Sequence, residues 1–181
     1  MGKVRQTKMK QALVIVDYQK DFVSGSLGFD GAELLDEKIA ARIEEALRSG
    51  TDVIYTLDTH DAGYPRTQEG RKLPVPHCIE GTGGHEIYGR TASYLPQAVA
   101  CIRKPVFGSW ELGEFVRARR YGVIELCGLV SHICVLSNAV VCRSALPEAE
   151  IRVRADCTGS GSPALHEAAL AVMRSLQVDV I

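Results

Sequence analysis

Three residues with reactive side chains, Asp17, Lys104 and Cys134, each stand just beyond an apolar run that is typical of a buried strand. A carboxylate can act as a general base, an ammonium group can hold negative charge in place, and a thiol can act as a nucleophile. In open sheets of parallel strands, ligands bind outside the carboxyl ends of the strands. These residues are therefore a candidate site for nucleophilic catalysis.

Cys134 lies in "GLVSHICVLSNAV", where a strand-like run passes through Gly128 into an apolar, helix-like segment. A helix N-terminus lowers the pKa of a thiol and offers N–H groups to an anion. However, a cysteine in an apolar setting can equally be a small buried hydrophobe, and Asp17 alone can be a turn residue. The other cysteines form no C-x-x-C pair, so we expect a reduced protein in which they fill space: Cys78, Cys101, Cys127, Cys142 and Cys157.

Asp58 and His60 form a D-x-H pair after a second strand-like run, and His77 follows in "LPVPHC". In extended backbone, residues two apart point to the same side. Two histidines and a carboxylate can bind a divalent metal ion, although a hydrogen-bonded loop histidine is the alternative. We expect structural roles for His85, in a glycine-rich loop, and for His166, on an exposed helical face.

Composition restricts the class of protein. The chain has 181 residues, 46% of them hydrophobic, and a net charge of −1, which favours neither nucleic acid nor an anionic membrane as a partner. The apolar runs are too short to span a bilayer or to form a signal peptide. We expect residues 1–10 to be a flexible leader, with Met9 as an alternative start, residues 11–181 to be one domain, and the protein to be cytoplasmic.

Apolar periodicity and glycine positions predict alternating strands and helices. The predicted strands are 11–16, 52–57, 98–102, 123–127, 150–153 and 178–181. The predicted helices are 34–49, 112–119, 134–145 and 163–176. Residues 61–92 form a long irregular excursion of a kind that is often functional. This alternation predicts an α/β fold with three layers, in which helices cover both faces of a mostly parallel six-stranded sheet.

Four segments, in order, resemble the motifs of the isochorismatase-like cysteine hydrolases, and among these the nicotinamidases. "VIVDYQKDF" is similar to the D-x-Q-x-D-F opening, and "LDTH" with "PVPHCIEGTGGHEI" is similar to the D-x-H and P-x-H-C-x-x-G-T-x-G-x-E segments. "RKPVFGS" resembles the stretch with the family lysine, and "GLVSHICV" resembles G-x-x-T-D-x-C-V. Because four motifs occur in family order, the resemblance is far more specific than any one of them.

The resemblance implies a Rossmann-like fold and a catalytic triad of Asp17, Lys104 and Cys134. It implies a cis peptide at Leu129–Val130 and an oxyanion hole made by the N–H groups of Val130 and Cys134. The implied reaction converts nicotinamide and water to nicotinate and ammonia through a thioester at Cys134, in NAD salvage. The same triad acting on another small amide, ureido or carbamoyl compound is the alternative.

The resemblance also implies one divalent metal ion, held by Asp58, His60 and His77, with Glu69 as a fourth ligand. Zinc is our first choice, and iron or manganese would also suit these donors. The ion would hold the pyridine nitrogen of the substrate. The relatives further imply a homo-oligomer, a dimer or a tetramer, with a small-molecule amide as substrate.

Two departures from the family motifs concern the substrate. The usual Thr-Asp is Ser131-His132, and an aromatic residue that often precedes the second histidine is replaced by Pro74. Phe22 keeps the aromatic of the opening motif. We expect Phe22, Phe107, Trp110 and His132 to contact the substrate.

Two further interpretations stay open on the residues alone. The first is a metal hydrolase that uses metal-bound water, with Cys134 incidental. The second is a non-catalytic dinucleotide-binding module, which the lack of G-x-G-x-x-G after the first strand disfavours.

Overall fold

The computed structural model describes residues 9–181, so most of the predicted leader, residues 1–10, lies outside the described residues. Lys10, the last residue of that predicted leader, contacts the sheet. The Lys10 ammonium pairs with Asp52, with 3.1 Å between Nζ and Oδ2. The Lys10 carbonyl accepts hydrogen bonds from the N–H groups of Gly122 and Val123. Backbone pairing with the segment before β4 therefore begins one residue before the first strand.

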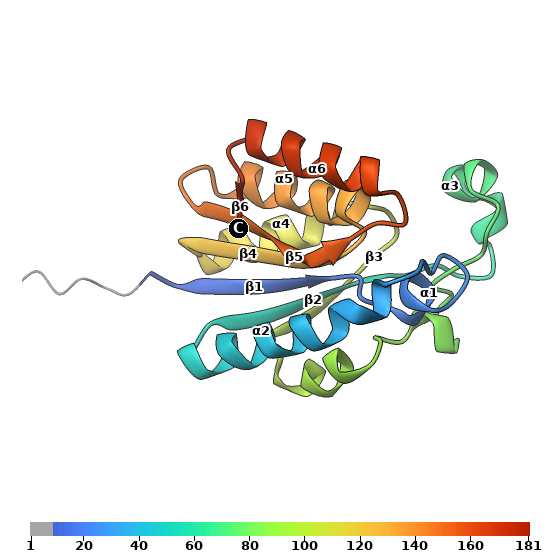
Figure 1. Ribbon diagram of the computed structural model, residues 1–181, viewed down its shortest axis with the longest axis horizontal. Helices are drawn as coiled ribbons and strands as arrows, with labels where there is room; N and C mark the ends of the chain where they lie inside the picture. The colour runs from blue at the N-terminus through green and yellow to red at the C-terminus, as the bar shows by residue number, and fades with distance from the viewer. Residues whose placement is uncertain (1–8) are drawn as a thin grey trace, which may run out of the picture.

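Six strands form one sheet in the order β3-β2-β1-β4-β5-β6, and every neighbouring pair is parallel. The strands are β1 (Gln11–Val16), β2 (Asp52–Asp58), β3 (Ala100–Lys104), β4 (Val123–Leu129), β5 (Glu150–Gly159) and β6 (Asp179–Val180). Helices cover both faces, so the predicted three-layer α/β architecture is confirmed (Figure 1). No helix within residues 9–181 is long and apolar enough to cross a membrane.

The central strand β1 shows why the layers form. Its alternate side chains point to opposite faces. Ala12, Val14 and Val16 enter the core on one face of the sheet, whereas Leu13 and Ile15 enter the core on the other face. A strand buried on both faces has a continuous apolar sequence, as "ALVIV" does. The main helices are α2 (Leu35–Ser49), α4 (Trp110–Arg119), α5 (Leu136–Ala145) and α6 (Pro163–Ser175).

Several predicted boundaries need correction. The third strand, predicted at 98–102, is Ala100–Lys104, because charged Arg103 and Lys104 are extended in the sheet. The fifth strand, predicted at 150–153, continues to Gly159 despite its polar side chains. The helix predicted to begin at Cys134 begins as a π-helical turn at Ser131–Val135 before α5. The hydropathy pattern thus predicts whether each segment is a strand or a helix, but it does not predict where the segment begins and ends.

The excursion predicted at 61–92 contains short helical turns, so it is irregular in path and not devoid of structure. These turns are η2 (Tyr64–Arg66), α3 (Gln68–Lys72), η3 (Gly83–His85) and η4 (Arg90–Gln97), and two others lie earlier in the chain, α1 (Lys20–Val23) and η1 (Ala32–Leu34). Together with the strand ends, this excursion surrounds the carboxyl edge of β1 and β2 (Figure 1).

The strand order places a crevice between β1 and β4. Chain connections run from β1 outward to β3 on one side and from β4 outward to β6 on the other. Ligands bind at such a switch point, outside the carboxyl ends of the strands. Asp17 follows β1 directly and the Ser131–Val135 turn follows β4. The topology thus brings two of the three reactive residues to one crevice.

One charged cluster joins the α2 layer to the sheet. Glu125, on β4 and 4% exposed, accepts hydrogen bonds from Arg42 of α2, at 2.6 and 3.0 Å, and from Arg154 of β5, at 2.9 Å. Burial alone would raise the pKa of Glu125, but the bonds from both arginines lower it below the usual value. The folded protein therefore favours the carboxylate.

We predict that Glu125→Gln lowers the free energy of unfolding by about 2–3 kcal/mol at pH 7, because it leaves two guanidinium groups without their shared carboxylate. A carboxyl whose pKa is lowered by folding stabilises the protein above its unfolded pKa, about 4.3. The difference between the variant and the wild type should thus shrink as pH falls below about 4. Urea unfolding at several pH values measures it.

The matched control is Glu37→Gln, which removes an exposed ion pair with Arg90. Exposed pairs contribute about 0–1 kcal/mol. Equal losses in the two variants would contradict the assignment of Glu125 as a buried structural charge.

Candidate active site

Asp17, Lys104 and Cys134 meet at the crevice between β1 and β4. The Lys104 ammonium lies 2.6 Å from Asp17 Oδ2 and 3.5 Å from Cys134 Sγ. All three residues are buried, at 0, 2 and 5% exposure. The predicted convergence of carboxylate, ammonium and thiol is thus present in the geometry.

Neighbouring groups fix the carboxylate and the ammonium. Asp17 has a left-handed φ of 46° as the chain leaves β1, and its Oδ1 accepts a 2.7 Å hydrogen bond from the Thr56 hydroxyl. Lys104 also donates to the Val106 carbonyl, at 3.1 Å. Thr56 was not singled out in the sequence, although it stands two residues before Asp58 on the same strand and therefore points to the same side.

The electrostatics of the thiol differ from the expectation. Burial raises the pKa of Cys134 well above its usual value, the Asp17 charge adds to the rise, and Lys104 opposes it. The helix start at Cys134 was expected to lower this pKa, and that expectation is wrong because desolvation outweighs the favourable groups. Burial likewise raises the pKa of Asp17, against the effect of Lys104. A carboxylate with a raised pKa is a better proton acceptor, which suits it to deprotonate the thiol.

The segment between β4 and the thiol has unusual backbone. The peptide joining Leu129 to Val130 is cis, as the resemblance implied. Gly128, before it, has φ of 108°, and a Cβ there would lie 2.0 Å from the Val16 carbonyl oxygen. β1 and β4 therefore approach each other as closely as only a glycine permits, which sets the separation of Asp17 from Cys134.

A second cluster adjoins the first. The donor atoms of Asp58, His60 and His77 lie within 4.8 Å of one another, and all three residues are buried. Asp58 Oδ2 is 3.0 Å from His60 Nε2 and 3.3 Å from His77 Nε2. Burial would raise the pKa of Asp58, but the two histidines and Lys104 lower it, so this residue is a carboxylate.

The donor set fits a divalent cation. His77 Nδ1 lies 2.8 Å from the Val75 carbonyl, so Nδ1 carries the proton and Nε2 presents a lone pair. That nitrogen lies 3.3 Å from Asp58 Oδ2, so either a proton on the imidazole or a divalent cation has to separate the two atoms. The predicted fourth ligand, Glu69, faces both histidines, with Oε1 3.7 Å from His77 Nε2 and 4.0 Å from His60 Nε2. Glu69 is not one of the three residues whose donor atoms all lie within 4.8 Å of one another.

Asp58 belongs to both clusters, because its other oxygen, Oδ1, lies 3.4 Å from Lys104 Nζ. The fully buried Gln19 holds Asp58 by its backbone. Gln19 Oε1 accepts from the Asp58 N–H at 2.8 Å, and Gln19 Nε2 donates to the Asp58 carbonyl at 2.9 Å. Gln19 stands in "VIVDYQKDF", but nothing in that motif alone shows that it positions a residue of the next strand.

Aromatic rings pack against the metal-ligand group, by which we mean Asp58, His60 and His77. Phe22 packs against His77 with ring centroids 5.5 Å apart. Tyr64, 1% exposed, packs on His60 at 4.7 Å and on His77 at 4.9 Å. Tyr64 was missed in the sequence, where it is one aromatic residue in an irregular excursion. Its hydroxyl donates to the Leu73 carbonyl, and so links the metal-ligand group to the segment with Pro74.

The remaining predicted contact residues lie further out. Phe107 is 42% exposed and Trp110 is 81% exposed, so the Trp110 ring does not line a buried site in this chain. His132 is half-buried, and its Nδ1 is buried without a hydrogen-bond partner among the described residues. Burial and the nearby His166 lower the pKa of His132.

Two structural expectations change in detail. His166 is half-buried, and its Nδ1 lies 3.1 Å from the hydroxyl of buried Ser131, so it does not stand on a purely exposed face. His85 has the expected loop role, with Nε2 2.9 Å from the Thr59 hydroxyl. Cys101 is exposed on β3 and was wrongly expected to fill space, whereas the other four non-site cysteines are buried.

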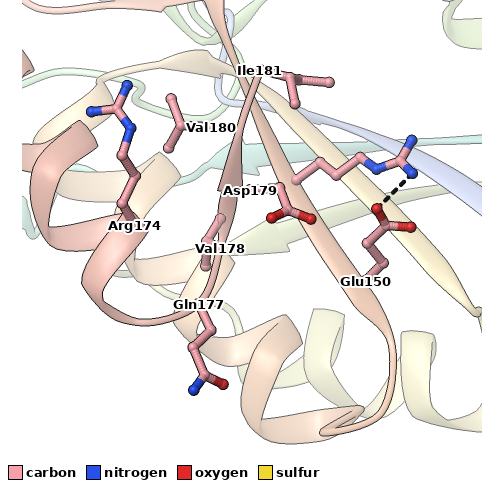
Figure 2. A pocket seen from close by; sticks show the side chains of 8 residues that line it. Glu150, Arg174, Gln177, Val178, Asp179, Val180 and Ile181 are labelled. Carbon is pink, nitrogen blue, oxygen red and sulfur yellow. Dashed lines mark ion pairs between the residues drawn. The ribbon is translucent and has the colours of Figure 1, made fainter.

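A hollow of about 520 Å³ lies beside the edge strand β6 and is separate from these clusters. Figure 2 shows its lining, in which Glu150 and Arg152 form an ion pair at 2.7 Å. Both residues stand at the amino end of β5. The reactive residues lie at the carboxyl ends, so this hollow takes no part in the site.

Comparisons with known proteins agree with this geometry. The isochorismatase domain model matches residues 11–181. The uncharacterized isochorismatase family protein PncA of Bacillus subtilis is 32% identical over 143 residues, covering 73% of this chain and 78% of its own. The nicotinamidase/pyrazinamidase of Mycobacterium tuberculosis is 28% identical and covers 94% of this chain and 98% of its own.

Among solved structures, the pyrazinamidase/nicotinamidase of Streptococcus mutans superposes with a TM-score of 0.86 at 27% identity, covering 95% of this chain and all of its own. The chain belongs to the isochorismatase family.

We predict that Gly128→Ala destabilises the protein and removes activity. The left-handed φ alone costs about 1–3 kcal/mol for a residue with a side chain, and the contact with Val16 would force β1 and β4 apart. Gly50→Ala is the control, since Gly50 has φ of 74° with nothing within 4 Å of an added Cβ. Urea unfolding midpoints should fall much further for Gly128→Ala, and equal falls would contradict the close approach.

Proposed function

We propose that this chain is a nicotinamidase, a metal-containing cysteine amidohydrolase that converts nicotinamide and water to nicotinate and ammonia. The observation that carries the proposal is the buried contact of Asp17, Lys104 and Cys134 beside a group of two histidines and a carboxylate. The relatives from M. tuberculosis and S. mutans, both named for this activity, support it. We place the reaction in NAD salvage in the cytoplasm.

The chain's own groups account for the first half of the reaction. Asp17 accepts the proton of the Cys134 thiol as the thiolate attacks the carboxamide carbon. Lys104, 2.6 Å from the carboxylate and 3.5 Å from the sulfur, keeps both in position and stabilises negative charge on either. Because the resting thiol has a raised pKa, the thiolate forms as the reaction proceeds and does not accumulate beforehand.

The N–H groups of Val130 and Cys134 receive the negative charge that develops on the carbonyl oxygen. One such donor contributes about 3 kcal/mol to lowering the barrier. Asp17 then gives its proton to the amide nitrogen, the C–N bond breaks and ammonia leaves. Asp17 next takes a proton from water as the water oxygen attacks the thioester carbon. The C–S bond breaks, Asp17 returns that proton to the sulfur, and nicotinic acid, which ionises to nicotinate, leaves the free thiol. Proton transfer of this kind contributes about 10²–10⁴-fold to the rate.

Asp58, His60 and His77 would hold a divalent ion, zinc in the first place, with Glu69 able to complete the set. When bound, the ion supplies a Lewis-acidic contact for the pyridine nitrogen and so orients the ring. Phe22, packed on His77, would bound the ring on one side. We keep Phe107, Trp110 and His132 as contacts at the outer edge of the site.

A second candidate substrate class is another small amide, ureido or carbamoyl compound. Two observations favour it: Pro74 replaces an aromatic residue, and the side chain of His132 has an unpaired buried nitrogen beside the nucleophile turn. Ammonia release measured across a panel of such compounds separates the two candidates. Turnover of a ureido compound with none of nicotinamide would move the proposal to the second class.

We predict that Cys134→Ala lowers kcat for nicotinamide by at least about 10³-fold, since loss of a catalytic nucleophile removes the covalent route. Bound metal should be unchanged, because Cys134 is not in the ligand group. Ammonia release and metal content measured on one preparation test both statements. Activity near that of the wild type would instead favour attack by metal-bound water.

We predict that His77→Ala lowers the affinity for Zn²⁺ by more than about 100-fold, because even neighbours of metal ligands contribute 10–100-fold. His85→Ala is the matched control, since His85 lies in the same excursion and outside the ligand group. Calorimetric titration with Zn²⁺ compares them, and Glu69→Gln reports whether the fourth carboxylate binds. Equal weakening in the His77 and His85 variants would exclude the assigned site.

A further inference from the structure

One buried amide outside the reactive groups is bonded to both sides of the site. Asn138 of α5 is fully buried and stands one helical turn after Cys134. Its Nδ2 donates to the Cys134 carbonyl at 2.8 Å and to the Phe107 carbonyl at 3.0 Å. Its Oδ1 accepts from the Ser109 N–H at 2.9 Å. Both amide hydrogens and the oxygen are therefore used.

The loop that Asn138 binds, residues 105–109, also holds the lysine. The Lys104 ammonium donates to the Val106 carbonyl at 3.1 Å, one residue before the Phe107 carbonyl that Asn138 holds. Ser109 ends the loop and caps α4, accepting a 3.0 Å hydrogen bond from the Leu112 N–H. The loop is thus fixed at one end by the helix cap and in its middle by Asn138 and Lys104.

We propose that Asn138 is a positioning residue for the thiol and the ammonium, because its amide ties the backbone of Cys134 to the loop that holds Lys104. This inference rests on the proposed function for its kinetic test. The bonds require an amide: only a group with two N–H donors and one acceptor can satisfy two carbonyls and one N–H at once. No other orientation of the side chain does so, because a flipped amide would point its oxygen at both carbonyls.

The consequence for the reaction concerns distance. Ammonium and sulfur are 3.5 Å apart, and they belong to β3 and to the turn after β4, which are not neighbours in the sheet. Asn138 is a direct link between these two elements through the loop. A displacement of about 1 Å at a reacting group can cost about 10²-fold in rate. Loss of the link should therefore affect turnover much more than binding.

The test is Asn138→Asp, which keeps the shape but presents oxygen to the Cys134 and Phe107 carbonyls. With nicotinamide, kcat should fall by about 10²-fold, while KM changes by less than about threefold. Metal content should stay at the wild-type value, because within residues 9–181 Asn138 makes no hydrogen bond to Asp58, His60 or His77. A purely structural role would lower the folded fraction and leave kcat per folded molecule unchanged.

A second readout needs no substrate. Alkylation of Cys134 by iodoacetamide, followed by peptide mapping to separate it from exposed Cys101, reports how well the thiolate is supported. It should be slowed by about tenfold in Asn138→Asp, because the thiolate loses its aligned ammonium. If wild-type protein does not hydrolyse nicotinamide, the proposed function fails, and this measurement still decides the role of Asn138.

Tyr121→Phe is the matched control. It removes the 2.6 Å hydrogen bond to Asp52, at the amino end of the sheet. It should leave both kcat and the alkylation rate of folded protein unchanged. If Asn138→Asp folds poorly, Asn138→Ser, which introduces no charge, replaces it in both measurements. Values for the Asn138 variant within twofold of wild type, per folded molecule, would overturn the proposal.

Discussion

A buried ammonium constrains this structure more than any other group. Lys104 is 2% exposed, and a charge removed from water is tolerated only where other groups replace its hydration. Asp17, Asp58, the Val106 carbonyl and the Cys134 sulfur do so, each within 3.5 Å of Nζ. Despite burial, these groups raise the pKa of Lys104, so the lysine stays charged. The elements that supply them must therefore meet in the folded state.

The parallel sheet satisfies that constraint. β1, β2 and β3 are adjacent, so Asp17, Asp58 and Lys104 arrive at one edge from neighbouring strands. The thiol comes from across the crevice, on the turn after β4, where Gly128 lets the two strands approach closely. The candidate metal ligands lie at the same edge of the sheet. Asp58 and His60 come from the end of β2, and the excursion that follows brings His77 next to them. The strand order therefore determines which reactive side chains meet in the site.

Much of this arrangement could be predicted from the sequence. Asp17, Asp58 and Lys104 were found because apolar runs end at or near them, and parallel alternation implies a shared edge. Cys134 was ambiguous until four motifs were taken together. Thr56, Tyr64 and Asn138 were missed, because their roles depend on contacts between segments far apart in the chain. The raised pKa of Cys134 was also missed, because a helix start is visible in a sequence and the depth of burial is not.

The two carboxylate oxygens of Asp58 contact different groups: one faces the Lys104 ammonium and the other faces His60 and His77. The reactive centre and the metal-ligand group therefore cannot diverge independently at this position. An asparagine or a histidine at this position would change the candidate metal ligands and would also remove a counter-charge from the lysine. Substitutions at His60, His77 or Glu69 would instead leave all four contacts of the lysine in place.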